Sequence, residues 1–108
     1  MPVFIAKVML QEVTNEDVYT ELDNAMADEE GYPYLTDEND KIFALPPDEY
    51  EFDTDLTAKE LLNIIKLLCA TIEKKHKLKK TPIVVVEAAE IVYANLEELS
   101  EDDFQPIN

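Results

Sequence analysis

The sequence predicts a small α+β domain in which two amphipathic helices cover one face of an antiparallel sheet. Three observations support this prediction: strand-like alternation of apolar residues near the N-terminus, helical spacing in two later stretches, and a β-branched run after the second of them. The length of 108 residues suits one domain, and a hydrophobic content of 46% is sufficient for a core.

Residues 3–11 predict the first strand. Apolar side chains recur at every second position and define one well-buried face, formed by Phe4, Ala6, Val8 and Leu10. The other face mixes Lys7 with apolar residues, so we expect it to be only partly covered.

Residues 15–29 predict the first helix. Thr14 stands three residues before Asp17, which is typical of a helix start. Apolar residues follow at helical spacing, at Val18, Leu22, Ala25 and Met26. Gly31 is expected to close the helix, because glycine adopts the left-handed conformation common at helix ends.

Residues 32–36 and 41–45 flank a polar turn and predict a hairpin that supplies the second and third strands. Pro46 and Pro47 interrupt the second arm of this hairpin. Alternation then resumes at residues 49–53, so the arm is expected to continue beyond a bend.

The second helix has the strongest sequence signature. Thr57 and Glu60 predict a capping box, and a broad apolar stripe follows at Leu61, Ile64, Ile65, Leu68 and Ile72. Pro82 then precedes a β-branched strand at residues 83–86. Residues 88–99 fit either a short helix or a last strand.

The resulting order is β-α-β-β-α-β, which is the split β-α-β order of ferredoxin-like domains. We therefore predict a single ferredoxin-like sandwich over residues 1–99, with two helices on one face of a four-stranded antiparallel sheet. The other face is expected to be free for a partner, a second subunit or RNA. Residues 100–108 are expected to form an acidic C-terminal tail.

The composition argues against several kinds of functional site. A single glycine argues against a glycine-rich phosphate loop, and the single cysteine, Cys69, excludes an internal disulfide and a cysteine-based zinc site. We expect Cys69 to be a core residue, and we expect no metal ion and no cofactor. The N-terminal apolar run lacks a basic leader, and no stretch is long enough to span a membrane, so the sequence predicts a cytoplasmic protein.

The distribution of charge is the most informative property for function. The formal net charge is −16, from 25 acidic residues and nine lysines, with no arginine. Five of the nine lysines fall in one seven-residue stretch, at Lys74, Lys75, Lys77, Lys79 and Lys80. The remaining surface is strongly acidic, which repels phosphate backbones and attracts basic partners.

His76, the only histidine, lies inside this lysine stretch. Any acid–base step by an imidazole must therefore use it. With the five lysines as ligands for RNA phosphates, His76 predicts a ribonuclease site. The alternative is a solvated helix end that contains a histidine for no catalytic reason.

A second candidate site is acidic. Between residues 28 and 55 only Lys41 opposes eleven acids, and we predict a partner-binding face there, formed by Asp48, Glu49, Glu51, Asp53 and Asp55. Rows of carboxylates can imitate the phosphates of a nucleic acid and occupy a basic groove on another protein. The alternative is a solvated face that serves solubility.

One motif resembles a known family. It joins a strand, a bend and a capping box, through Leu45, Pro46, Tyr50, Leu56, Thr57, Ala58 and Glu60, and an IVVVEA strand follows. In residues 36–72 the chain resembles the GhoS-type antitoxins, and the order of elements extends the similarity to about residues 3–96. The resemblance implies a small ferredoxin-like endoribonuclease that cleaves the mRNA of a membrane toxin. The motif contains no catalytic residue, and the lack of arginine departs from what RNA cleavage requires.

Two functions are therefore predicted. The first is a GhoS-like antitoxin that acts on toxin mRNA. The second is an acidic protein-binding module, such as a DNA mimic that inhibits a basic host or defence protein. A third interpretation is a structural domain whose acidity serves only solubility. A homodimer, where one forms, is expected to use the open sheet face.

Overall fold

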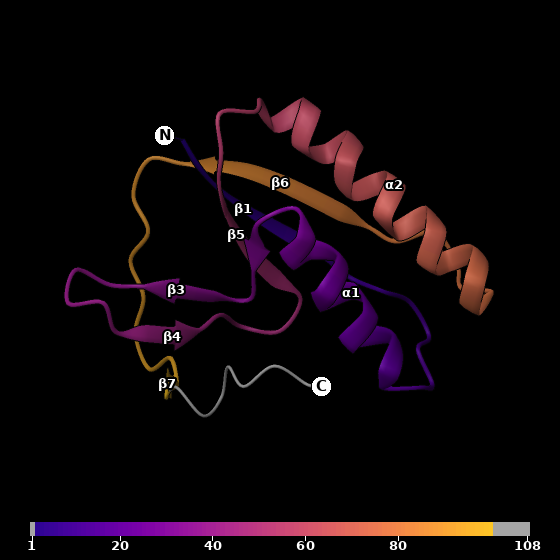
Figure 1. The fold of residues 1–108 in the computed structure, drawn as a ribbon, viewed down its shortest axis with the longest axis horizontal. Coiled ribbons are helices and arrows are strands. Elements are labelled where there is room, and N and C mark those ends of the chain that lie inside the picture. The colour runs from indigo at the N-terminus through magenta and orange to yellow at the C-terminus, as the bar shows by residue number, and fades with distance from the viewer. Residues whose placement is uncertain (1, 101–108) are drawn as a thin grey trace.

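The structure, a computed structural model, describes residues 2–100. Within them the chain forms two helices and seven strands (Figure 1). In order these are β1 (Val3–Val8), α1 (Asp17–Asp28), β2 (Gly31–Tyr32), β3 (Tyr34–Thr36), β4 (Ile42–Ala44), β5 (Glu49–Asp53), α2 (Ala58–His76), β6 (Ile83–Ala88) and β7 (Glu98–Leu99). The prediction of a mixed α+β domain with two helices is confirmed. The predicted tail lies, from residue 101 on, outside the described residues.

The strands form two antiparallel sheets. The larger sheet has four strands in the order β2-β5-β1-β6, so β1 is central and β6 occupies an edge. The smaller sheet has three strands in the order β3-β4-β7. The number of strands and the second sheet differ from the single four-stranded sheet that the sequence predicts.

The predicted hairpin forms, but it belongs to the smaller sheet. β3 and β4 pair from Tyr34 opposite Ala44 to Thr36 opposite Ile42. The larger sheet instead takes β2 and β5, which the prolines separate from the hairpin: Pro33 divides β2 from β3, and Pro46 with Pro47 divides β4 from β5. A proline removes a backbone donor and fixes φ, so each arm changes course at that point.

Both helices cover the same face of the larger sheet. The alternating residues of β1 and β5 on that face are buried, at Phe4, Ala6, Val8, Tyr50 and Phe52. They form one cluster with the apolar stripes of the helices, at Val18, Leu22, Met26, Leu61, Ile65, Cys69 and Ile72. The predicted alternation in β1 and the predicted core position of Cys69 are both confirmed.

The start of α2 follows the prediction. The Glu60 N–H donates to the Thr57 Oγ1 over 3.1 Å, and the Thr57 N–H donates to the Glu60 Oε1 over 2.9 Å. This reciprocal pair is a complete capping box.

The end of α1 differs from the prediction. Glu30, with φ of 64°, takes the left-handed conformation, whereas Gly31 begins β2 with a negative φ. Gly31 is required there for a different reason: a Cβ atom at this position would lie 2.1 Å from Cζ of Phe52. The glycine makes room for a core aromatic ring and does not serve as a helix cap.

The second face of the larger sheet is only partly free. A cavity of about 560 Å³ lies between this face and the smaller sheet, lined by Val3 and Glu51 from the sheet, Leu35 from β3, and Ile91 and Tyr93 from the segment after β6. Part of the open face is therefore covered.

The covering segment, residues 89–97, is irregular, and only β7 beyond it is a strand. Of the two alternatives predicted for residues 88–99, the short helix is absent and the last strand forms only at its end, as β7. The ring of Tyr93 in this segment packs at 5.5 Å from that of Phe43 in β4, which ties the segment to the hairpin. At the β6 edge, Val84 and Val86 stay exposed.

Candidate functional site

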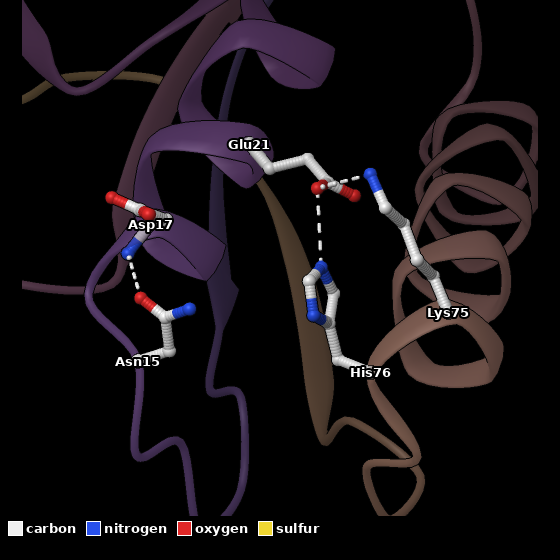
Figure 2. Close-up of polar contacts among 5 residues, drawn as sticks. All are labelled: Asn15, Asp17, Glu21, Lys75 and His76. Atoms are coloured by element: carbon white, nitrogen blue, oxygen red, sulfur yellow. Dashed lines mark hydrogen bonds and ion pairs between the residues drawn. The ribbon is translucent and has the colours of Figure 1, made fainter.

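His76 lies against the neighbouring helix. α1 and α2 pack side by side, and this brings His76, the last residue of α2, to Glu21 in the middle of α1 (Figure 2). His76 Nε2 is 3.1 Å from Glu21 Oε1. Because an ionised carboxylate only accepts hydrogen bonds, Nε2 is the donor, and Nδ1 of the neutral ring remains able to accept a proton.

Lys75 joins the same carboxylate. Its Nζ donates to Glu21 Oε1 over 3.0 Å, so one oxygen receives bonds from both residues (Figure 2). The hydrogen bond from Lys75, followed by that from His76, holds the pKa of Glu21 below its usual value. A carboxylate that orients an imidazole in this way can fix its tautomer and stabilise the imidazolium formed when Nδ1 takes a proton.

The start of α1 sets the position of Glu21. The carboxamide oxygen of Asn15 accepts the N–H of Asp17 over 3.0 Å (Figure 2). The prediction that Thr14 plays this part is wrong, because the side chain one residue later reaches the first free N–H of the helix. Glu21 follows one turn into α1, on the side that faces α2.

The lysine stretch is partly neutralised by acids of the same chain. Lys75 pairs with Glu21, and Lys79 pairs with Glu12 over 3.3 Å. The others, Lys74, Lys77 and Lys80, have no ion-pair partner within residues 2–100. The five lysines therefore surround the end of α2 and the turn after it, but they offer less free positive charge than their number suggests.

The predicted acidic face is brought together in part. Glu49, Glu51 and Asp53 alternate along β5 and share the sheet face opposite the core, with about 6.6 Å between successive positions. Asp48 and Asp55 lie just outside the two ends of the strand. We call Glu49, Glu51 and Asp53 the β5 acid row.

Glu51 is the central member of the β5 acid row. It is half-buried and lines the cavity beneath the smaller sheet, and no residue in the range 2–100 forms an ion pair with it. Burial, and then the charge of Asp53, raise the pKa of Glu51. A cation placed beside this carboxylate would relieve both effects.

A second contact, which the sequence did not predict, joins Tyr50 of β5 to Asp23 of α1 and is partly buried. The Tyr50 hydroxyl donates to Asp23 Oδ1 over 2.5 Å. Burial raises the pKa of Asp23, while the bond from Tyr50 opposes that rise. Together with Asp48 and Glu49 this pair lines a cavity of about 400 Å³.

Sequence reasoning also missed Glu21 as the partner of His76. Glu21 and Asp23 stand on the polar side of α1, where acidic residues are common and carry no signal of their partners. Only the packing of α1 on α2 and β5 reveals the two contacts.

Metal and membrane sites gain no support. Within residues 2–100 no three side chains of His, Cys, Asp or Glu converge to hold a metal ion. None of the helices described is both long and apolar enough to cross a bilayer.

No protein-family model matches this chain, and no curated protein matches its sequence. The resemblance to the GhoS-type antitoxins therefore stays a prediction from the residues that form the motif.

Proposed function

We propose that this protein is an acidic binding protein that engages a basic surface on a partner protein through the β5 acid row. The arrangement of Glu49, Glu51 and Asp53 on one sheet face is the observation that carries the proposal. Carboxylates in a row along a strand present regularly spaced negative charges, as nucleic-acid phosphates do, so a groove that binds phosphates is a suitable partner surface.

The charge of the whole chain supports the same proposal. A net charge of −16 accelerates the encounter with a basic partner and disfavours binding to RNA or DNA. The unpaired, half-buried Glu51 adds a specific contact, because a partner lysine or arginine would satisfy a carboxylate that has no cation in residues 2–100.

The test is capture of partners from the native host at low and high salt, with identification by mass spectrometry. The informative variant neutralises the row, as Glu49→Gln, Glu51→Gln and Asp53→Asn. The matched control neutralises three acids at the ends of α1, as Glu16→Gln, Asp28→Asn and Glu29→Gln, and changes the net charge equally. We expect a basic nucleic-acid-binding protein that is lost only with the row variant; equal loss with both variants would contradict a site on β5.

The second candidate is a GhoS-like antitoxin that cleaves toxin mRNA. The observation that favours it is the contact of His76 with Glu21 beside Lys75. The Nδ1 of His76 would take the proton of a ribose 2′-hydroxyl, Glu21 would stabilise the imidazolium, and Lys74, Lys77 and Lys80 would hold phosphates.

RNA cleavage tests this candidate directly. Purified protein is incubated with the mRNA of a small membrane toxin, and His76→Ala is compared with Lys59→Ala, a variant on the first turn of α2. Cleavage lost only in His76→Ala would support the antitoxin. No cleavage by the unaltered protein would overturn this candidate.

We also infer a ferredoxin-like core located in the cytoplasm. The helix order and the sheet order β6-β1-β5-β2 support that core, with β3, β4 and β7 as additions to it. The free thiol of Cys69 suits a reducing compartment. A homodimer through the open sheet face stays a prediction.

A further inference from the structure

β6 leaves one edge of the larger sheet without a strand partner among residues 2–100. It pairs with β1 from Ile83 opposite Val8 to Ala88 opposite Val3. The Met9 N–H donates to the Pro82 carbonyl over 3.1 Å, and this bond fixes which backbone groups face β1. Antiparallel pairs alternate, so the N–H and C=O groups of Ile83, Val85 and Glu87 point to the free edge.

The β6 edge lacks most of the features by which natural proteins prevent an exposed edge strand from pairing with another chain. Natural edges carry lysine, proline or a bulge within the strand, or are short. β6 is six residues long, its first four residues are IVVV, and its register with β1 runs without a bulge. The side chains of Val84 and Val86 are 59% and 53% exposed beside it, and Figure 1 shows β6 extended along the length of α2.

We propose that two copies of this chain pair antiparallel through β6 and join their four-stranded sheets into one continuous sheet. A two-fold axis perpendicular to the sheet relates such copies, so residues directly opposite each other must lie on the same face. This condition is met only when the two-fold axis lies between one residue of β6 and the same residue of the second copy, and each register is named by that residue. The register centred on Val85 places Val84 opposite Val86 of the second copy and brings the four exposed valines together.

The charges that flank β6 favour the register centred on Val85, and they favour a second copy of the chain as the partner. Lys80 lies three residues before β6 and Glu90 two residues after it. If the register centred on Val85 is continued beyond both ends of the strand, Lys80 comes opposite Glu90 of the second copy, and the symmetric contact repeats this pair. Both residues are exposed, and neither has an ion-pair partner within residues 2–100. Centring on Val84 would set Lys80 opposite Ala88 and leave the charges unmatched. The basic residue before one β6 therefore meets the acidic residue after the other, which offsets part of the repulsion between two chains of charge −16.

The oligomeric state of the full chain tests the proposal, measured by sedimentation over a range of concentrations. We expect a dimer that Lys80→Glu and Glu90→Lys each weaken at least tenfold and that the double exchange restores, since the double variant has the original net charge. Lys59→Glu is the matched control, because it changes the charge by the same amount on an exposed lysine outside β6. A monomer at every concentration up to the millimolar range, or failure of the double exchange to restore the dimer, would overturn the proposal.

A backbone variant distinguishes the β6 edge from the open sheet face. Val85→Pro removes an N–H that points to the free edge and leaves the hydrogen bonds between β6 and β1 in place. We expect this variant to be a monomer with an unchanged circular dichroism spectrum. A folded Val85→Pro that remains a dimer would show that another surface, such as the open face, forms the interface.

Discussion

Gly31 lies so close to the ring of Phe52 that a Cβ atom on it would be 2.1 Å from Cζ and 2.4 Å from Cε2. Phe52 is 1% exposed and is held by the core, so its ring has no space in which to move. We expect Gly31→Ala to lower the free energy of unfolding by about 1–3 kcal/mol, the usual result of adding a methyl group to a packed site. Urea unfolding followed by circular dichroism measures the change.

The neighbouring position provides the control. Glu30 has φ of 64°, where a side chain costs about 1–2 kcal/mol relative to glycine. We expect Glu30→Gly to stabilise the protein. A destabilising Glu30→Gly would contradict the left-handed conformation of Glu30 and would leave Gly31 as the helix cap that the sequence predicts.

Glu51→Gln tests the cost of burying an ionised carboxylate in the β5 acid row. The folded state raises the pKa of Glu51, so its ionised form is disfavoured on folding. This group favours folding below its unfolded pKa and loses that contribution as the pH rises through its folded pKa. Glu51→Gln is therefore expected to stabilise the protein at pH 7 and to have little effect once carboxylates are protonated. Unfolding titrations at several pH values measure this; a destabilising effect at pH 7 would contradict it.

Tyr50→Phe tests the contact with Asp23. The variant leaves a half-buried carboxylate without its hydroxyl donor, and we expect a loss of about 1–3 kcal/mol at neutral pH. Because the lost bond lowers the pKa of Asp23, that pKa should rise further in the variant. NMR titration of the Asp23 carboxyl carbon in the unaltered protein and in the variant measures the shift.

Glu21→Gln tests the contact with His76. The folded state lowers the pKa of Glu21, so its contribution to stability is present above its unfolded pKa and is lost as the pH falls through its folded pKa. The cost of Glu21→Gln should therefore be seen at neutral pH and disappear in acid. Unfolding measured at several pH values gives this cost, and an equal cost at neutral and at acidic pH would contradict the contact.

Local signals in the sequence predicted the elements that local physics controls. The Thr57 and Glu60 capping box fixes where α2 begins, and the alternation at residues 3–11 identifies the buried face of β1. The strand division was not predicted, because Pro33 and the two prolines at 46 and 47 cut each arm of the hairpin and assign its halves to different sheets. Periodicity reports which face is buried, but it does not report the sheet to which a strand belongs.

One candidate site could be predicted from the sequence and the other could not. Glu49, Glu51 and Asp53 are two residues apart, so their common face follows from strand geometry alone. The contact between Glu21 and His76 joins residues 55 positions apart, and it depends on how two helices pack. The spacing of residues in the sequence does not show which side chains two packed helices bring into contact.

The smaller sheet has a consequence for access to the β5 acid row. β7 pairs with β4 across a separation of more than 50 residues, and the Ala44 N–H donates to the Glu97 carbonyl over 2.8 Å. Yet among β3, β4 and β7 only Leu35 is buried, so little apolar packing holds this sheet. We expect its amide hydrogens to exchange with solvent well before those of β1, because few buried apolar contacts oppose its local opening. Such opening would expose the half-buried Glu51 further, so a ligand that covers the whole of this carboxylate is expected to favour the opened sheet.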